Sequence, residues 1–187
     1  HIICHHSGAT DYNRYADTSN QTFSDVNAWH RDARDPDGSF KYHYGQPSSL
    51  GFYLAYHYLI TKDGIVHQGR ADTEKGFHTI GYNEQSIGIC LTGNFDYYLP
   101  TWPQTLALKN LLVSKSAQYG VPLQNIVPHR KFSTKSCFGS RLSDWWASDL
   151  VSSSTGERIT LMKQLLIHLK TLLSLLQKRK IGGADKG

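Results

Sequence analysis

The sequence predicts a single α/β domain with a central mixed β-sheet flanked by helices, followed by a C-terminal amphipathic helix. Short β-rich runs alternate with helical patterns through residues 1–156, as is typical of α/β proteins. The 187 residues are enough for one domain with a buried core. After Thr155-Gly156 the pattern changes to a long leucine-rich helical periodicity. We therefore predict a domain over residues 1–156 and a basic helical tail over residues 157–187.

The first half of the domain predicts a strand, a helix and a hairpin. Residues 2–5 form an apolar run before a small-residue turn, which indicates a buried strand. The segment FSDVNAWHRDAR predicts a helix that begins near Ser24 as its N-cap. Residues 35–51 are rich in turn-forming residues and are expected to be mostly irregular. The β-rich runs 53–60 and 65–68 flank an Asp-Gly turn and predict a hairpin.

The second half predicts two strands and one long helix. SIGICLTGNF is apolar and β-rich, which predicts a strand ending near Gly93-Asn94. Residues 101–120 carry apolar side chains at helical spacing, and Gly120 is expected to be the C-cap. VPLQNIVPHR predicts a short strand that leads into the segment VPHRKFSTKSC. Trp145 and Trp146 are expected to be buried against the domain.

Composition excludes several classes of protein. Hydrophobic residues make up 39% and charged residues 19%, which argues against global disorder. The chain has no apolar run of 18 residues, so it predicts no membrane-spanning helix, and no charged-then-apolar leader precedes the domain. Residues 1–156 hold 13 basic and 13 acidic groups, whereas residues 157–187 hold seven and two. This balance argues against a nucleic-acid-binding surface on the domain.

Cysteine and histidine raise the question of a metal site. Cys4, Cys90 and Cys137 are odd in number and widely spaced, which does not predict a disulfide framework. His129 and Cys137 lie eight residues apart and could supply two ligands to zinc, with a third from the strand that ends at His5. The alternative is a set of ordinary surface or core histidines, because ten histidines make chance groupings easy.

Five segments, in order, resemble one family. They are IICHHSGAT, DVNAWHRDAR, YHYLITKDGIVHQGR, GFHTIGYNEQSIGICLTGNFD and VPHRKFSTKSC. Together they resemble the zinc-dependent N-acetylmuramoyl-L-alanine amidases, the type shared by phage lysozyme-amidases and peptidoglycan recognition proteins. The resemblance runs from His1 to about Trp146. One departure is Phe138, which stands where the family usually has a proline after the ligand cysteine.

The resemblance implies roles for individual residues. It makes His5, His129 and Cys137 the ligands of a Zn²⁺ ion, with Tyr56 and Lys135 as catalytic residues. His6 matches no ligand role. The candidates for a groove that binds a muramyl sugar and its stem peptide are Trp29, His30, Arg31, Arg70, His78 and Asn83. An equally simple interpretation makes Arg70 and Asn83 structural turn residues.

The implied function is hydrolysis of the bond between N-acetylmuramic acid and L-alanine in bacterial peptidoglycan. Such an enzyme would act at the bacterial cell wall, either secreted or phage-encoded and released into the periplasm, as a phage-type endolysin does. Two alternatives are a non-catalytic peptidoglycan-binding receptor and a zinc peptidase that cuts within the stem peptide. Because recognition-only members of the family lack the ligand cysteine, Cys137 favours the enzyme.

The tail leaves three interpretations open. Positions 162, 166, 169, 173 and 176 are apolar and step by four and three, which is the spacing of a coiled coil. The helix could therefore associate with copies of itself through residues 161–176, or fold back on its own domain. Its lysines and apolar stripe would also suit an anionic membrane surface.

Overall fold

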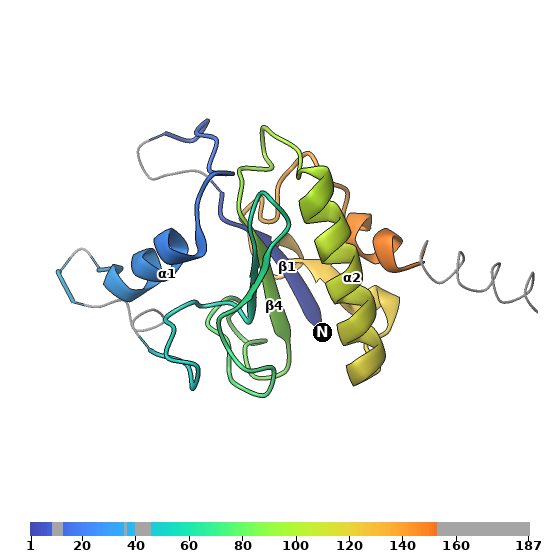
Figure 1. Cartoon of the computed structure of the whole chain (residues 1–187), viewed down its shortest axis with the longest axis horizontal. Helices are drawn as coiled ribbons and strands as arrows, with labels where there is room; N and C mark the ends of the chain where they lie inside the picture. The colour runs from blue at the N-terminus through green and yellow to red at the C-terminus, as the bar shows by residue number, and fades with distance from the viewer. Residues whose placement is uncertain (9–12, 36, 40–45, 153–187) are drawn as a thin grey trace, which may run out of the picture. The chain divides into compact units, whose positions relative to one another are not determined.

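A computed structural model describes residues 1–8, 13–35, 37–39 and 46–152, and it contains the predicted mixed sheet (Figure 1). The strands lie in the order β3-β2-β4-β1-β5. All neighbours are parallel except β2 and β3, which form an antiparallel pair. The five strands are β1 (Ile2–His6), β2 (Tyr58–Ile60), β3 (Val66–Gln68), β4 (Ile87–Leu91) and β5 (Ile126–Pro128).

The chain divides into two units, His1–Val151 and Ser152–Gly187, and the fold described below is that of the first. The predicted helical tail lies outside the described residues, so its boundary and its role stay predictions. In the described part of the chain, no helix is long and apolar enough to cross a membrane.

The helices α1 (Phe23–Asp32) and α2 (Trp102–Tyr119) flank the sheet and are capped by local residues, and a further helical segment over residues 146–152 adds Ala147 and Val151 to the core. In α1 the cap is Thr22, whose side chain accepts from the Asp25 amide while the Asp25 carboxylate accepts from Thr22. The predicted cap at Ser24 is therefore wrong by two residues. The long helix α2 ends as predicted at Gly120, which adopts the left-handed conformation with φ 61°.

The sheet face under α2 carries the main core. Because successive side chains of a strand point to opposite faces, Ile2 and Cys4 of β1 share this face. They pack with Leu108 and Leu112 of α2. The other buried members of this cluster are Tyr58, Ile60, Ile87, Ile89, Leu91, Phe95, Ile126, Phe138, Leu142, Ala147 and Val151. Full burial of each large apolar side chain contributes about 1.5–3 kcal/mol, so this face is the main source of stability.

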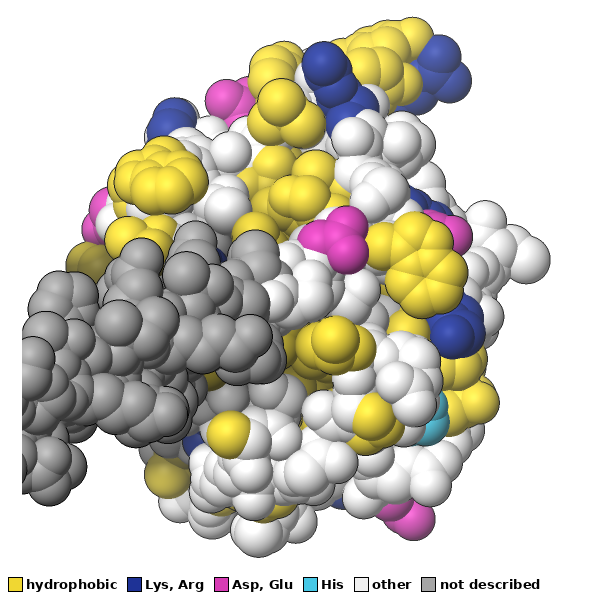
Figure 2. Space-filling model, turned by 90° about the vertical axis from the view of Figure 1, so that its right-hand side faces the viewer, with side chains coloured by type: hydrophobic (Ala, Val, Ile, Leu, Met, Phe, Trp, Pro, Cys, Tyr) yellow, Lys and Arg dark blue, Asp and Glu magenta, His cyan; other side chains and the backbone are white. Residues whose placement is uncertain are grey.

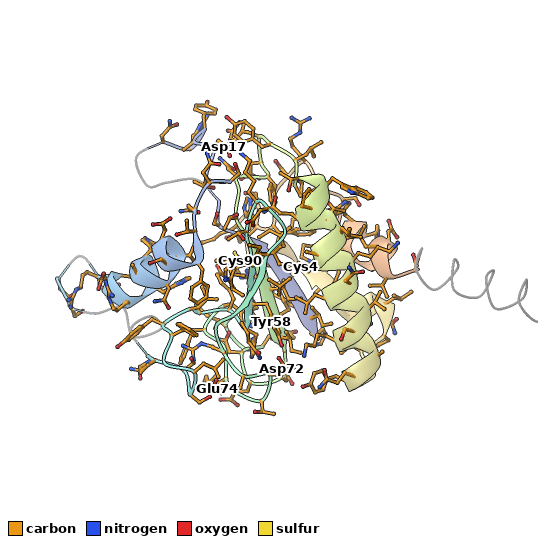
Figure 3. The ribbon with its side chains drawn as sticks, viewed as in Figure 1. Cys4, Asp17, Tyr58, Asp72, Glu74 and Cys90 are labelled. Carbon is orange, nitrogen blue, oxygen red and sulfur yellow. The ribbon has the colours of Figure 1, made fainter. Side chains whose placement is uncertain are left out.

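The opposite face carries a smaller apolar cluster and the polar side chains. Cys90 of β4 pairs in register with His5 of β1, and both point away from α2. Cys90 packs with Leu54, Leu59 and Val26 of α1. Cys4 and Cys90 therefore come from adjacent strands but lie on opposite faces of the sheet (Figure 3). We call the face of His5 and Cys90 the site face.

Two expectations fail at the periphery. The strand predicted over residues 53–60 is regular only in β2, because the backbone of residues 53–55 bonds to α1 and to a loop instead of a neighbouring strand. Tyr53 N donates to Asn27 Oδ1 at 2.7 Å, and the Ala55 carbonyl accepts from Phe77 N at 2.9 Å. Trp145 is 61% exposed, so only Trp146 of the predicted buried pair packs against the core.

Candidate metal centre

Three side chains from separate parts of the chain meet on the site face. His5 lies near the end of β1, His129 begins the short 3₁₀ helix directly after β5, and Cys137 follows in the next loop. Because β1 and β5 are parallel neighbours, with Cys4 opposite Pro128, the two histidines leave the sheet side by side. One potential ligand atom from each of the three residues lies within 4.8 Å of the other two.

The spacing fits a tetrahedral zinc site. Cys137 Sγ lies 3.6 Å from His5 Nδ1, and the rings of His5 and His129 have centroids 4.5 Å apart. Zinc bound at about 2.0–2.1 Å to nitrogen and about 2.3 Å to sulfur requires about 3.5 Å between such atoms. Two imidazoles and one thiol with a fourth position left for solvent are also the donor set of catalytic zinc. These three residues therefore fit the metal.

Burial favours the neutral form of all three predicted ligands. Burial raises the pKa of the Cys137 thiol to about 12 and lowers the pKa of His5 well below its usual value. It also lowers the pKa of His129, and the positive charge of Lys135 lowers it further. Neutral imidazoles are ready to donate their lone pairs, and a bound divalent cation supplies the charge that stabilises a thiolate.

The loop that carries Cys137 is held from two sides. The Asp96 carboxylate accepts from Ser136 Oγ and from Ser140 N, each at 2.7 Å. Arg130 donates to the carbonyls of Gly139 and Leu142, each at 2.6 Å. Phe138, which replaces the family's usual proline, is fully buried in the core under α2. Sequence reasoning missed Asp96 and Arg130, although Arg130 directly follows a predicted ligand.

The two predicted catalytic residues lie beside the ligands. The ring of Tyr56 has its centroid 4.9 Å from that of His5 and 5.5 Å from that of His30. Lys135 is exposed on the loop before Cys137, where its charge acts on both His129 and Cys137. The ring of Tyr56 and the charge of Lys135 thus both lie close to the predicted ligands.

The predicted groove residues divide into exposed and buried sets. Trp29 is 52% exposed, and Arg31 is exposed and paired with Asp32. His30 is fully buried in α1, next to Tyr56. The exposed pair stays a prediction for substrate contact.

Arg70, Asn83 and His78 make contacts within the protein. Arg70 is 3% exposed and donates to the backbone carbonyls of Leu54 and Gln46, so it braces the loops. Asn83 Oδ1 accepts from the amides of His78 and Thr79, which is the structural role of a turn residue. His78 is 8% exposed and lies within hydrogen-bond distance of the predicted ligand His5. Contact of these three residues with substrate stays a prediction.

Comparison with known proteins agrees with this geometry. The family model described as N-acetylmuramoyl-L-alanine amidase matches residues 1–140. The endolysin of Escherichia phage T7 is 36% identical over 112 residues, which cover 55% of this chain and 71% of that protein. The endolysin of Klebsiella phage KP32 is 34% identical over 111 residues, with the same coverage.

Solved structures share the fold. The N-acetylmuramoyl-L-alanine amidase LysC from Clostridium intestinale superposes with a TM-score of 0.59 at 21% identity, over 82% of this chain and 83% of that chain. Wild-type Drosophila PGRP-LB gives a TM-score of 0.55 at 25% identity, over 76% of this chain and 75% of that chain. Since the family model spans most of the sequence and the fold agrees, the chain belongs to the N-acetylmuramoyl-L-alanine amidase family.

Proposed function

We propose that this chain hydrolyses the amide bond between N-acetylmuramic acid and L-alanine in bacterial peptidoglycan, with a zinc ion held by His5, His129 and Cys137. The observation that carries the proposal is the convergence of these three ligands on one face of the sheet. The phage endolysins among its relatives support degradation of the bacterial cell wall as the setting.

Each residue has a role that follows from its chemistry. When bound, zinc supplies Lewis acidity, which polarises an amide carbonyl and activates water. Two neutral imidazoles and one thiolate leave about one unit of positive charge on the site. As water adds to the carbonyl carbon, negative charge grows on its oxygen, and Lys135 is the cation available to stabilise that charge. One such group typically contributes about 3–4 kcal/mol to lowering the barrier.

Tyr56 provides the second polar group. It stands beside His5, before β2, where its hydroxyl can donate a hydrogen bond to the same oxygen or pass a proton to the departing nitrogen of L-alanine. The products are the lactyl carboxylate of muramic acid and a stem peptide with a free amino terminus. This stoichiometry consumes one water for each bond cut.

Product analysis tests the proposal. Purified peptidoglycan is digested with the full chain, and the soluble products are identified by mass spectrometry. We expect intact stem peptides that begin with L-alanine. Peptides cut within the stem would indicate a zinc peptidase instead, and binding to peptidoglycan without any release would indicate a receptor. Either result would contradict the proposed reaction.

A further inference from the structure

The ligand His5 has different partners on its two ring nitrogens. Its Nδ1 faces Cys137 Sγ at 3.6 Å, on the side where the ligand atoms converge. Its Nε2 lies 3.0 Å from Nδ1 of the buried His78. The hydroxyl oxygen of Thr79, Oγ1, also lies 3.0 Å from this His78 nitrogen. The ring of His5 is therefore held between the metal position and another imidazole.

Only one arrangement of protons satisfies these contacts with a metal bound. If His5 Nδ1 gives its lone pair to the metal, its proton is on Nε2, which then donates to His78 Nδ1. His78 must accept through Nδ1 and carry its own proton on Nε2. The Thr79 hydroxyl donates to the same acceptor. His78 has to remain neutral in this arrangement, because a doubly protonated imidazole has no lone pair on Nδ1 with which to accept.

The ring of His78 is confined by the backbone around it. A Cβ atom at Gly88 would lie 2.4 Å from His78 Cδ2, and one at Gly76 would lie 2.5 Å from the same atom. Both distances are too short for real carbon atoms, so two glycines make the space that this ring fills. The amides of His78 and Thr79 both donate to Asn83 Oδ1, at 2.8 and 2.7 Å, which fixes the backbone.

A second histidine supports the wall of this space. His57 Nδ1 accepts from Gly88 N at 3.0 Å, and His57 Nε2 bonds to the Glu74 carbonyl at 2.9 Å. Its ring lies edge-on to that of His78, with centroids 5.8 Å apart. His78 therefore cannot turn away from His5 without breaking the packing of β4 and of the loop before it.

We propose that His78 is a positioning residue, which fixes the orientation and the tautomer of His5 by accepting its Nε2–H. Metal-ligating histidines usually donate this proton to a carboxylate, a backbone carbonyl or water. A neutral imidazole that accepts this proton adds no negative charge. Among the three proposed ligands and His78, the Cys137 thiolate is then the one anion. The inference rests on the proposed zinc site and deepens it.

Zinc affinity, measured without turnover, tests the role. A matched pair of variants is His78→Asn and His78→Gln, because the Asn carbonyl reaches the position of Nδ1 whereas the Gln amide reaches that of Nε2. In competition with a chelator, we expect His78→Gln to bind zinc about 10–100-fold more weakly than the native chain. His78→Asn is expected to recover most of that loss. Thermal unfolding of the metal-free variants confirms that both are folded.

A second readout separates orientation from simple loss of packing. In cobalt-substituted protein, the thiolate-to-cobalt absorption of Cys137 is expected to persist in both variants, while the ligand-field bands shift only in His78→Gln. Equal zinc affinity in the native chain and both variants would overturn the role of His78, as would equal loss in both. A native chain that binds no zinc would instead overturn the proposed function.

Discussion

The two faces of the sheet are built from the same strands but contain different chemistry. Toward α2, β1 contributes Ile2 and Cys4 to the apolar core, whereas toward the site it contributes His5. On β4, Ile89 faces the core, and Gly88 and Cys90 face the site. A step of one residue, about 3.3 Å, therefore separates a residue that stabilises the fold from one that we propose as a metal ligand. Substitutions on the core face should therefore change the stability of the fold, and substitutions on the site face should change metal binding and catalysis.

The outer surface on the α2 side also differs from the site face in its side chains. Viewed from that side, hydrophobic side chains are scattered among polar ones and little histidine is visible (Figure 2). The buried histidines His5, His57 and His78 instead gather on the site face. Substitutions on each face are therefore expected to have different consequences.

The sharpest contrast pairs two cysteines from opposite faces. Cys137→Ala removes the sulfur ligand, so we expect zinc binding to be lost and peptidoglycan hydrolysis to fall by at least about 10³-fold. Cys4→Ala is the matched control, because Cys4 is a buried core thiol under α2. It should retain zinc and activity at a modest cost in stability. Metal analysis and turnover on both variants check this, and loss of zinc from Cys4→Ala alone would contradict the division of the faces.

Lys135 tests chemistry without metal loss. We expect Lys135→Met to slow hydrolysis by about 10²–10³-fold, because the growing charge on the carbonyl oxygen loses its cation. Zinc content should be unchanged. Lys131→Met, in the same loop region, serves as the control for general charge loss. If both variants slow hydrolysis equally, the loss of activity comes from the lower net charge of the protein, and the assigned role of Lys135 is wrong.

Leu112 tests the core face. It is fully buried in α2, and Leu112→Ala should lower the free energy of unfolding by about 2–5 kcal/mol through lost burial and a residual cavity. Urea unfolding of the metal-free protein measures this change. Zinc affinity and turnover of the folded fraction should match the native chain. A large drop in zinc affinity would show that the two faces are energetically coupled.

Acid should destabilise the site face through its buried histidines. Burial lowers the pKa of His30 to about 3, and it also lowers that of His57. Folding favours the neutral form of each histidine. The contribution of each to the free energy of unfolding is therefore fully present above the unfolded pKa of about 6.5, and it is lost as pH falls toward the folded pKa. For His30 the expected slope is about 1.4 kcal/mol per pH unit within that window.

The corresponding measurement is urea unfolding of the zinc-free protein at pH 7 and pH 5. His30→Phe should lose less stability on acidification than the native chain does. An identical loss in the two proteins would remove His30 from this account.

Arg31 should show the smallest effect. It is paired with Asp32 on the surface of α1, and exposed ion pairs contribute about 0–1 kcal/mol. Arg31→Ala should therefore leave the midpoint of urea unfolding nearly unchanged. A rise in KM on soluble muramyl-peptides would support its predicted contact with substrate, and an unchanged KM would remove it from the groove.

The sequence was sufficient for the features that depend on local pattern. The mixed sheet, the cap at Gly120 and the placing of Cys90 in a buried strand all follow from periodicity or turn chemistry. The ligand set came from family motifs, and the structure places all three ligands together. The spacing of His129 and Cys137 predicts two ligands and the strand that ends at His5 a third, but only the folded sheet shows that β1 and β5 are neighbours.

The features that sequence reasoning missed depend on contacts between distant segments. His78 carries no local mark of burial, and its role depends on Gly76 and Gly88, which lie in separate segments. Arg70 has the charge expected of a carboxylate-binding residue, and in the fold its guanidinium donates to the backbone carbonyls of Leu54 and Gln46. Such assignments require coordinates, because residue type alone does not reveal which partner is nearer.

The central claim is that the site face holds one zinc ion between two imidazoles and a thiolate. X-ray absorption at the zinc edge of the purified chain tests it most directly. The account predicts one sulfur at about 2.3 Å and two imidazole nitrogens at about 2.0–2.1 Å, with a light atom in the remaining position. A zinc shell without sulfur, or a chain that takes up no zinc, would contradict it.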